Sequence, residues 1–305
     1  MKGICSALLG LILTAGMCFA GERSTSQFRT NSDIVLINAT VLDRQNRPVR
    51  GLTRDQFRLF DEKAEESIAY FSEEEVPVSV AVLFDVSGSM QGKLADMRLA
   101  LASVLQSANV QDEFSLITFA DRPRVVVGWT RRPEEIQNDV LLSAAHGETS
   151  LLDALQITLN YLKKATNSRK AIVIFSDGGD NHSRFTEREA MRDVQEAGAE
   201  LYALDSTDWL ISPPHSPEEI SGPDLLERLC DRAGGRYFQA DGKRDWTVAA
   251  ERISRELRSQ YLIGYVPSTT GDDGRFHHVR LQLNQPSGAP KLYLFFRRGY
   301  RAPND

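Results

Sequence analysis

Three oxygen-bearing side chains alternate along one short segment, and their types and spacing suit a hard metal ion. Asp85, Ser87 and Ser89 occupy every second position, and Gly88 lets the backbone bend tightly between the serines. A set made only of carboxylate and hydroxyl oxygens favours Mg²⁺, Mn²⁺ or Ca²⁺ over zinc. The segment is therefore a candidate divalent-cation loop, although serine, glycine and aspartate also build ordinary turns.

The elements on either side predict where this loop lies in the fold. Residues 78–84 are apolar and largely β-branched, a pattern typical of a strand buried on both faces of a parallel sheet. Residues 93–106 have the pattern of a helix. The loop therefore follows the carboxyl end of a central strand, which is the edge where open α/β sheets bind ligands.

Two later segments carry further oxygen ligands in similar positions. Thr149 lies in Gly-Glu-Thr-Ser-Leu, directly before a predicted helix at residues 151–164. Asp177 lies in Phe-Ser-Asp-Gly-Gly-Asp-Asn, directly after a predicted buried strand at residues 170–175. Together with the Asp-x-Ser-x-Ser loop, these motifs resemble the metal-ion-dependent adhesion site (MIDAS) of von Willebrand factor A (VWFA) domains. The resemblance covers residues 78–261.

The resemblance implies a fold, a cofactor and a type of partner. The fold is α/β, with a doubly wound, mostly parallel, Rossmann-like sheet. The cofactor is a divalent cation, most often Mg²⁺, with Ser87 and Ser89 as direct ligands and the aspartates often acting through water. In this family the equivalent of Thr149 contacts the metal in one of two states. A cation held mainly by neutral ligands attracts an anionic oxygen, so the implied partner is a protein that offers an Asp or Glu carboxylate. The implied function is metal-dependent protein binding, or adhesion.

Two residues beside Asp177 are possible supporting groups. Asp180 and Asn181 either lie in the outer shell of the metal or simply solvate a turn. Asp153, four residues after Thr149, is expected to be a charge at a helix N-terminus rather than a ligand.

An enzymatic function fits the sequence less well, and we predict a protein that is not an enzyme. A hydrolase using Ser87 would need a partner histidine or a G-x-S-x-G elbow, and neither motif surrounds it. A phosphotransferase using Asp85, similar to the haloacid dehalogenase family, would need a second aspartate where Ser87 stands. The main alternative is a structural or envelope-assembly protein without a metal-dependent ligand.

Composition and the first residues bear on location and partners. The 305 residues are 41% hydrophobic and 26% charged, with a net charge of −6, and no basic stripe predicts nucleic-acid binding. Residues 1–20 predict a signal peptide cleaved near Ala20; a transmembrane anchor, or a lipoprotein through Cys18, is the alternative. We therefore expect an exported protein, periplasmic or secreted, without a transmembrane span in the mature chain. Only Cys230 would remain after cleavage, so no intrachain disulfide is expected.

The flanks of the α/β region differ from it in character. Residues 21–32 are a predicted flexible leader, and residues 301–305 a tail. Residues 33–75 and 261–300 alternate apolar and polar side chains, which is typical of antiparallel strands. Neither set is large enough to bury two faces alone. We therefore predict one small β-sandwich, with the α/β domain of residues 76–260 inserted into it. These flanks resemble those of secreted acidobacterial proteins with VWFA-related domains.

Two local expectations complete this organisation. Residues 57–60 and 67–71 are predicted to pair as a hairpin across residues 61–66. Residues 207–223 contain four prolines and are predicted to form a long loop, followed by a helix at residues 224–233.

Overall fold

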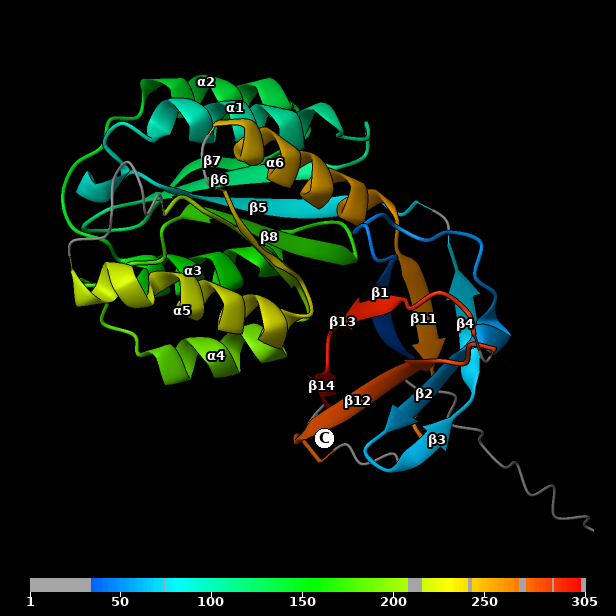
Figure 1. Ribbon diagram of the computed structural model, residues 1–305. Helices are drawn as coiled ribbons and strands as arrows, with labels where there is room; N and C mark the ends of the chain where they lie inside the picture. Colours follow the sequence, from blue (N-terminus) through cyan, green and yellow to red (C-terminus); the bar gives the residue numbers. More distant parts are fainter. Residues whose placement is uncertain are drawn as a thin grey trace, which may run out of the picture. The chain divides into compact units, whose positions relative to one another are not determined.

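The computed structural model describes residues 34–73, 75–207, 216–240, 243–268, 273–286 and 288–302 (Figure 1). The expected signal peptide and leader, and residues 303–305 of the expected tail, lie outside the described residues. The described chain contains one six-stranded sheet and two four-stranded sheets. No helix in the described ranges combines the length and the hydrophobicity that spanning a membrane requires.

The six-stranded sheet has the strand order β10-β9-β8-β5-β6-β7. Its strands are β5 (Val78–Asp85), β6 (Glu113–Phe119), β7 (Arg124–Thr130), β8 (Arg169–Ser176), β9 (Glu200–Asp205) and β10 (Tyr237–Gln239). All neighbours run parallel except β7, which pairs antiparallel with β6 at one edge. The chain continues from β5 to β6 on one side and returns through β8 to the other side. The carboxyl end of β5 is therefore a topological switch point, where such sheets bind ligands.

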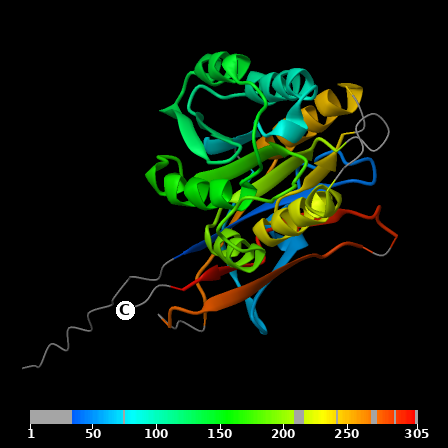
Figure 2. The same cartoon turned by 90° about the vertical axis from the view of Figure 1, so that its left-hand side faces the viewer.

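Helices cover both faces of this sheet, as Figures 1 and 2 show. One face carries α1 (Leu94–Gln106), α2 (Pro133–Leu142) and α6 (Lys243–Arg258); the other carries α3 (Leu151–Tyr161), α4 (Glu187–Glu196) and α5 (Pro217–Ala233). Short 3-10 turns occupy Arg54–Gln56, Gly88–Met90 and Leu162–Lys164. Every residue of β5 is buried, because its alternate side chains enter the two cores. This confirms the expected doubly wound α/β fold.

The flanking strands form two sheets that share one core. The first sheet has the order β13-β1-β11-β4 and the second β14-β12-β2-β3. Their strands are β1 (Val35–Leu42), β2 (Phe57–Asp61), β3 (Ala64–Glu66), β4 (Ile68–Ser72), β11 (Tyr261–Tyr265), β12 (Phe276–Leu283), β13 (Tyr293–Phe296) and β14 (Gly299–Arg301). Each sheet combines strands that precede the α/β domain with strands that follow it, and one hydrophobic cluster lies between them. The predicted insertion of the α/β domain into a β-sandwich is thus confirmed.

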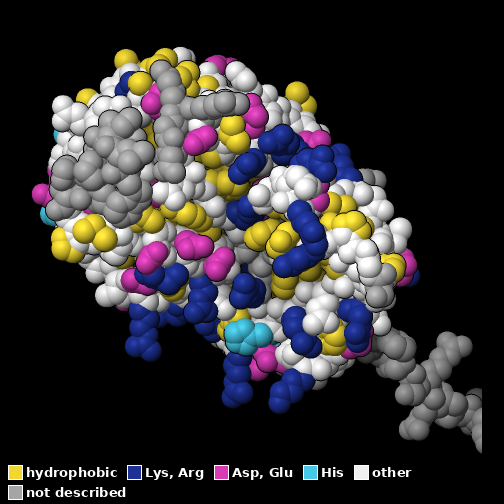
Figure 3. Space-filling view, in the orientation of Figure 1, with side chains coloured by type: hydrophobic (Ala, Val, Ile, Leu, Met, Phe, Trp, Pro, Cys, Tyr) yellow, Lys and Arg dark blue, Asp and Glu magenta, His cyan; other side chains and the backbone are white. Residues whose placement is uncertain are grey.

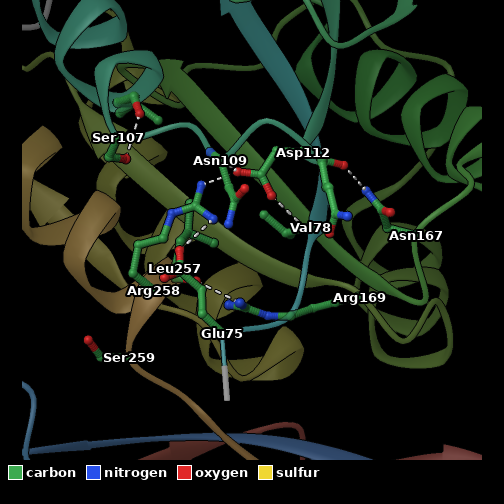
Figure 4. Close-up of polar contacts among 12 residues, drawn as sticks. Glu75, Val78, Ser107, Asn109, Asp112, Asn167, Arg169, Leu257, Arg258 and Ser259 are labelled. Atoms are coloured by element: carbon green, nitrogen blue, oxygen red, sulfur yellow. Dashed lines mark hydrogen bonds and ion pairs between the residues drawn. The ribbon is translucent and has the colours of Figure 1, made fainter. Parts of the chain in front are cut away.

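A buried aspartate connects the first strand of the inserted domain to its last helix (Figure 4). Asp112 is 1% exposed and accepts hydrogen bonds from the backbone N–H of Val78 (2.9 Å) and of Asn109 (2.6 Å). It also pairs with the guanidinium of Arg258, at the end of α6, which in turn lies 3.3 Å from Glu75. The first residue of β5 and the last turn of α6 are therefore held together.

The expected hairpin between residues 57–60 and 67–71 is wrong. Strand β2 turns back at once onto β3, with Glu62 in the left-handed region at φ 51°, while β4 pairs with β11 in the other sheet. An alternating pattern identifies a half-buried strand but not its neighbour, which is why the pairing could not be predicted.

The expected long loop at residues 207–223 is also too long. Helix α5 begins at Pro217, because the Ser216 hydroxyl accepts a hydrogen bond from the Glu219 N–H (3.1 Å) and proline is well suited to the first helical position. Pro223 lies inside this helix. The many prolines in this segment predicted a loop, although Ser216 and Pro217 together form a favourable start for a helix.

Candidate metal centre

The first loop of the site begins where β5 ends. Asp85 is fully buried, and its Oδ1 accepts a hydrogen bond from the backbone N–H of Ser87 (2.8 Å). This turn places the hydroxyl oxygen of Ser87 3.2 Å from that of Ser89. Ser87 is buried, whereas Ser89 is partly exposed. Two hydroxyl groups therefore lie side by side between a buried carboxylate and the surface.

The second loop is attached to the first by backbone hydrogen bonds. The N–H of Gly88 donates to the carbonyl of Gly147 (2.9 Å), and the N–H of His146 donates to the carbonyl of Val86 (2.8 Å). Gly147 has φ +76°, and a Cβ there would lie 2.6 Å from the Asp121 carboxylate, which accepts from the Glu148 N–H at 2.7 Å. A side chain at this position would be strained, which favours glycine. The turn places Thr149, which is 6% exposed, at the same sheet edge as the two serines.

The third loop follows β8 and is tied to the second. Asp177 is 3% exposed, and its Oδ1 accepts from the Gly179 N–H (3.3 Å). The carbonyl of Thr149 accepts from the N–H groups of Asn181 (3.1 Å) and His182 (3.0 Å), and the Asn181 side-chain oxygen accepts from the Thr149 N–H (2.8 Å). The structure thus brings all five predicted residues to three connected loops at one sheet edge.

Asp85 and Asp177 are both buried at this edge, and the charge of Asp177 acts on Asp85. The second oxygen of Asp85 accepts a hydrogen bond from the Ser176 hydroxyl (2.6 Å), at the end of the neighbouring strand. Burial, reinforced by the negative charge of Asp177, raises the pKa of Asp85 to about 7. Burial likewise raises the pKa of Asp205, at the end of β9, to about 6. Burial therefore disfavours the charged form of both carboxyl groups.

Two contacts of the site were not predicted from the sequence. Ser176 orients Asp85, and its position between the predicted strand of residues 170–175 and Asp177 was the available signal. Lys93, 14% exposed, places its Nζ 3.4 Å from Asp177 Oδ2. A basic residue at the start of the helix that follows the first loop could have suggested this contact.

The two predicted supporting residues have different partners. Asn181 holds the backbone of Thr149 and donates to the Glu148 carboxylate (2.6 Å). Asp180 instead accepts from the N–H of Leu152 (2.8 Å), in the first turn of α3. Asp153 accepts from the N–H groups of Arg184 (2.8 Å) and Phe185 (3.1 Å), so its carboxylate positions the loop before α4.

The donor set is chemically suited to a hard divalent cation. It offers three hydroxyl and two carboxylate side chains, with two hydroxyls adjacent and the carboxylates close enough to repel one another. Over the described ranges, no group of three or more His, Cys, Asp or Glu side chains is arranged for a metal ion. Any cation at this edge would thus depend on the hydroxyl oxygens.

Comparisons with known proteins agree on the fold. Residues 80–179 match the family model of the von Willebrand factor type A domain. A search of the curated proteins found no match. A von Willebrand factor type A structure from Catenulispora acidiphila has a TM-score of 0.50 and 13% sequence identity, covering 90% of this chain and 76% of that chain.

Two further solved structures are similar over part of the chain. Proximal thread matrix protein 1 from the mussel byssus has a TM-score of 0.52 and 14% identity, covering 65% of this chain and 51% of its own. An aerotolerance-related membrane protein from Bacteroides fragilis NCTC 9343 has a TM-score of 0.50 and 16% identity, covering 59% and 98%. At such identities the likeness concerns the fold alone.

Proposed function

Because the chain contains a von Willebrand factor type A domain, we propose that it is an exported protein-binding module that works through a divalent cation. The single observation that carries the proposal is the convergence of three loops at the end of β5. There the hydroxyl oxygens of Ser87 and Ser89 lie 3.2 Å from each other, at the same edge as two buried carboxylates. The family match covers residues 80–179, which contain all five residues of the proposed site.

Each side chain has a distinct role in this proposal. Ser87, Ser89 and Thr149 supply neutral hydroxyl ligands, while Asp85 and Asp177 supply the balancing negative charge. Asn181 supports the Thr149 loop through its backbone hydrogen bonds. The cation, Mg²⁺ in preference to Mn²⁺ or Ca²⁺, supplies a Lewis-acidic position for one carboxylate of a partner protein.

The local contacts favour binding over catalysis. The Ser87 hydroxyl has Ser89 as its neighbour, and no histidine of the described residues forms a hydrogen bond with it. Both oxygens of Asp85 already accept hydrogen bonds, from Ser87 and Ser176, which suits a fixed charge better than a nucleophile. On the face shown in Figure 3, basic and acidic side chains are interspersed, in keeping with a protein partner rather than nucleic acid.

Calorimetric titration of the mature protein with MgCl₂ and MnCl₂ tests the metal. We expect one cation per chain, and a loss of binding in Ser87→Ala and Ser89→Ala. Ser221→Ala, on the exposed part of α5, is the matched control and should bind as the wild type does.

Affinity capture from the envelope and medium of the source cell tests the partner. A protein retained in Mg²⁺ and released by a chelator supports the proposal, particularly if free aspartate-rich peptide competes. Equal retention with and without chelator would exclude the metal-bridged mechanism and favour the alternative of a structural, envelope-assembly role.

A further inference from the structure

Lys93 brings a positive charge into the proposed metal site. Its backbone is fixed at the start of α1, since its N–H donates to the Met90 carbonyl (2.9 Å) and its carbonyl accepts from the Met97 N–H (3.1 Å). Its side chain is 14% exposed and ends 3.4 Å from Asp177 Oδ2. The lysine is thus placed by the same loop that carries the two serines.

The contact is close but not tight. Charge-assisted hydrogen bonds between an ammonium and a carboxylate are usually about 2.7–2.9 Å long, so 3.4 Å leaves the ammonium near Asp177 without a strong bond. Of the basic side chains that the structure describes, Lys93 alone forms an ion pair with one of the five site residues. It therefore balances part of the negative charge of Asp177.

We infer that Lys93 is an internal cation that competes with the divalent metal for Asp177. The inference rests on the proposed function, because it concerns the same site. A divalent cation near Asp177 would repel an ammonium a few ångströms away, and burial reduces the screening of that repulsion. Metal binding must therefore displace Lys93 or leave it next to the metal as an unbalanced positive charge.

Two consequences follow for the same site. Before metal binds, Lys93 offsets the repulsion between the carboxylates and stabilises the folded loops. Once metal binds, the charge of Lys93 would no longer be balanced by Asp177, and it would add to the attraction of the site for an anion. Such a site needs a higher concentration of divalent cation than the same site without the lysine, and it favours a partner with a carboxylate.

Substitution of the lysine tests the competition directly. In Lys93→Met the charge is removed while the aliphatic length is kept, and calorimetry with Mg²⁺ and with Mn²⁺ should show affinity about tenfold tighter than in the wild type. The Tm of the metal-free variant should be lower than that of the wild type, and saturating Mg²⁺ should raise it by more. Lys93→Arg keeps the charge and should bind metal no more tightly than the wild type.

Lys163→Met is the control, because Lys163 is exposed and its ammonium donates a hydrogen bond to Asn160, outside the three loops of the site. Unchanged or weaker metal affinity in Lys93→Met overturns the inference, and so does an equal gain in Lys93→Met and Lys93→Arg, which would indicate packing rather than charge. If the wild type binds neither Mg²⁺ nor Mn²⁺, the proposed function itself fails, and that result is distinct from both.

Discussion

At the scale of single residues, Asp85 is the most constrained group of the proposed site. It is fully buried and accepts from a backbone N–H and a serine hydroxyl, yet its pKa is raised to about 7 by burial and by Asp177. Its hydrogen bonds thus offset only part of the cost of removing the charge from water. The positive charge of a bound metal ion would offset the rest of this cost.

The raised pKa of Asp85 predicts a characteristic pH dependence in metal-free buffer. The folded protein binds this proton more strongly than the unfolded chain, whose pKa is near 3.8, so the group stabilises the fold below about pH 4. That contribution is lost as the pH rises to about 7, at up to about 1.4 kcal/mol per pH unit. Urea unfolding in chelator should therefore show wild type losing stability relative to Asp85→Asn between pH 5 and pH 7. Parallel curves would contradict this.

Asn181 is predicted to affect metal binding without contacting the metal. Asn181→Ala removes the acceptor of the Thr149 N–H and the donor to Glu148, so the Thr149 loop should loosen. We expect Mg²⁺ affinity to fall about tenfold, as is common when a supporting residue is removed. Calorimetry measures this, with Asn160→Ala on the exposed side of α3 as the control; a change of similar size in both variants would argue against a specific role.

At the scale of elements, the third loop is held in place by close packing against α5. A Cβ at Gly222 would lie 2.3 Å from the Asp177 carbonyl, so the backbones of the loop and helix approach more closely than any side chain permits. The position of Asp177 thus depends on a glycine 45 residues later in the chain.

Gly222→Ala should therefore disturb both stability and the site. Because the obstacle is backbone, α5 and the loop must separate, and we expect a loss of about 2–3 kcal/mol in the free energy of unfolding, together with weaker Mg²⁺ binding. Chemical denaturation and calorimetry measure the two effects. Ser221→Ala, on the preceding and exposed position, should show neither; a Gly222→Ala protein that matches it would refute the packing argument.

The sequence predicted the elements that local patterns determine. Each part of the proposed site is one short motif at a strand end or helix start, so Asp85, Thr149 and Asp177 could be placed without knowing the tertiary contacts. Strand partners could not be placed, because the alternation in residues 68–72 fits either sheet of the sandwich. Lys93 and Ser176 were missed since each acts through a side chain on another loop or strand.

At the scale of the whole described molecule, one buried aspartate joins the two flanks of the sandwich. Asp61, from β2, is fully buried and accepts from the hydroxyls of Tyr265 (3.0 Å) and Tyr300 (2.9 Å), which follow the inserted domain. His277 lies 3.6 Å from its other oxygen. The sandwich therefore depends on polar as well as apolar contacts between distant parts of the chain.

Asp61→Ala should destabilise the sandwich and leave the proposed metal site intact. The substitution leaves two tyrosine hydroxyls without their buried acceptor, and we expect a loss of about 2–4 kcal/mol in the free energy of unfolding. Denaturation followed by tyrosine and tryptophan fluorescence measures it, and Mg²⁺ affinity at low temperature should not change. Lys63→Ala, on the exposed β2–β3 turn, is the control. A loss of metal affinity in Asp61→Ala would show that the two parts are coupled.

The pairing of Ser72 with Leu262 has a consequence for how the polypeptide folds during synthesis. These neighbours are separated in sequence by the entire inserted domain, and closing so long a segment of unfolded chain is slow. Once the inserted domain has folded, its ends are held together and the closure becomes local. Strands β1 and β4 therefore lack their shared neighbour β11 until the inserted domain has been synthesised. Their unpaired edges in that interval are where a chaperone would be needed most.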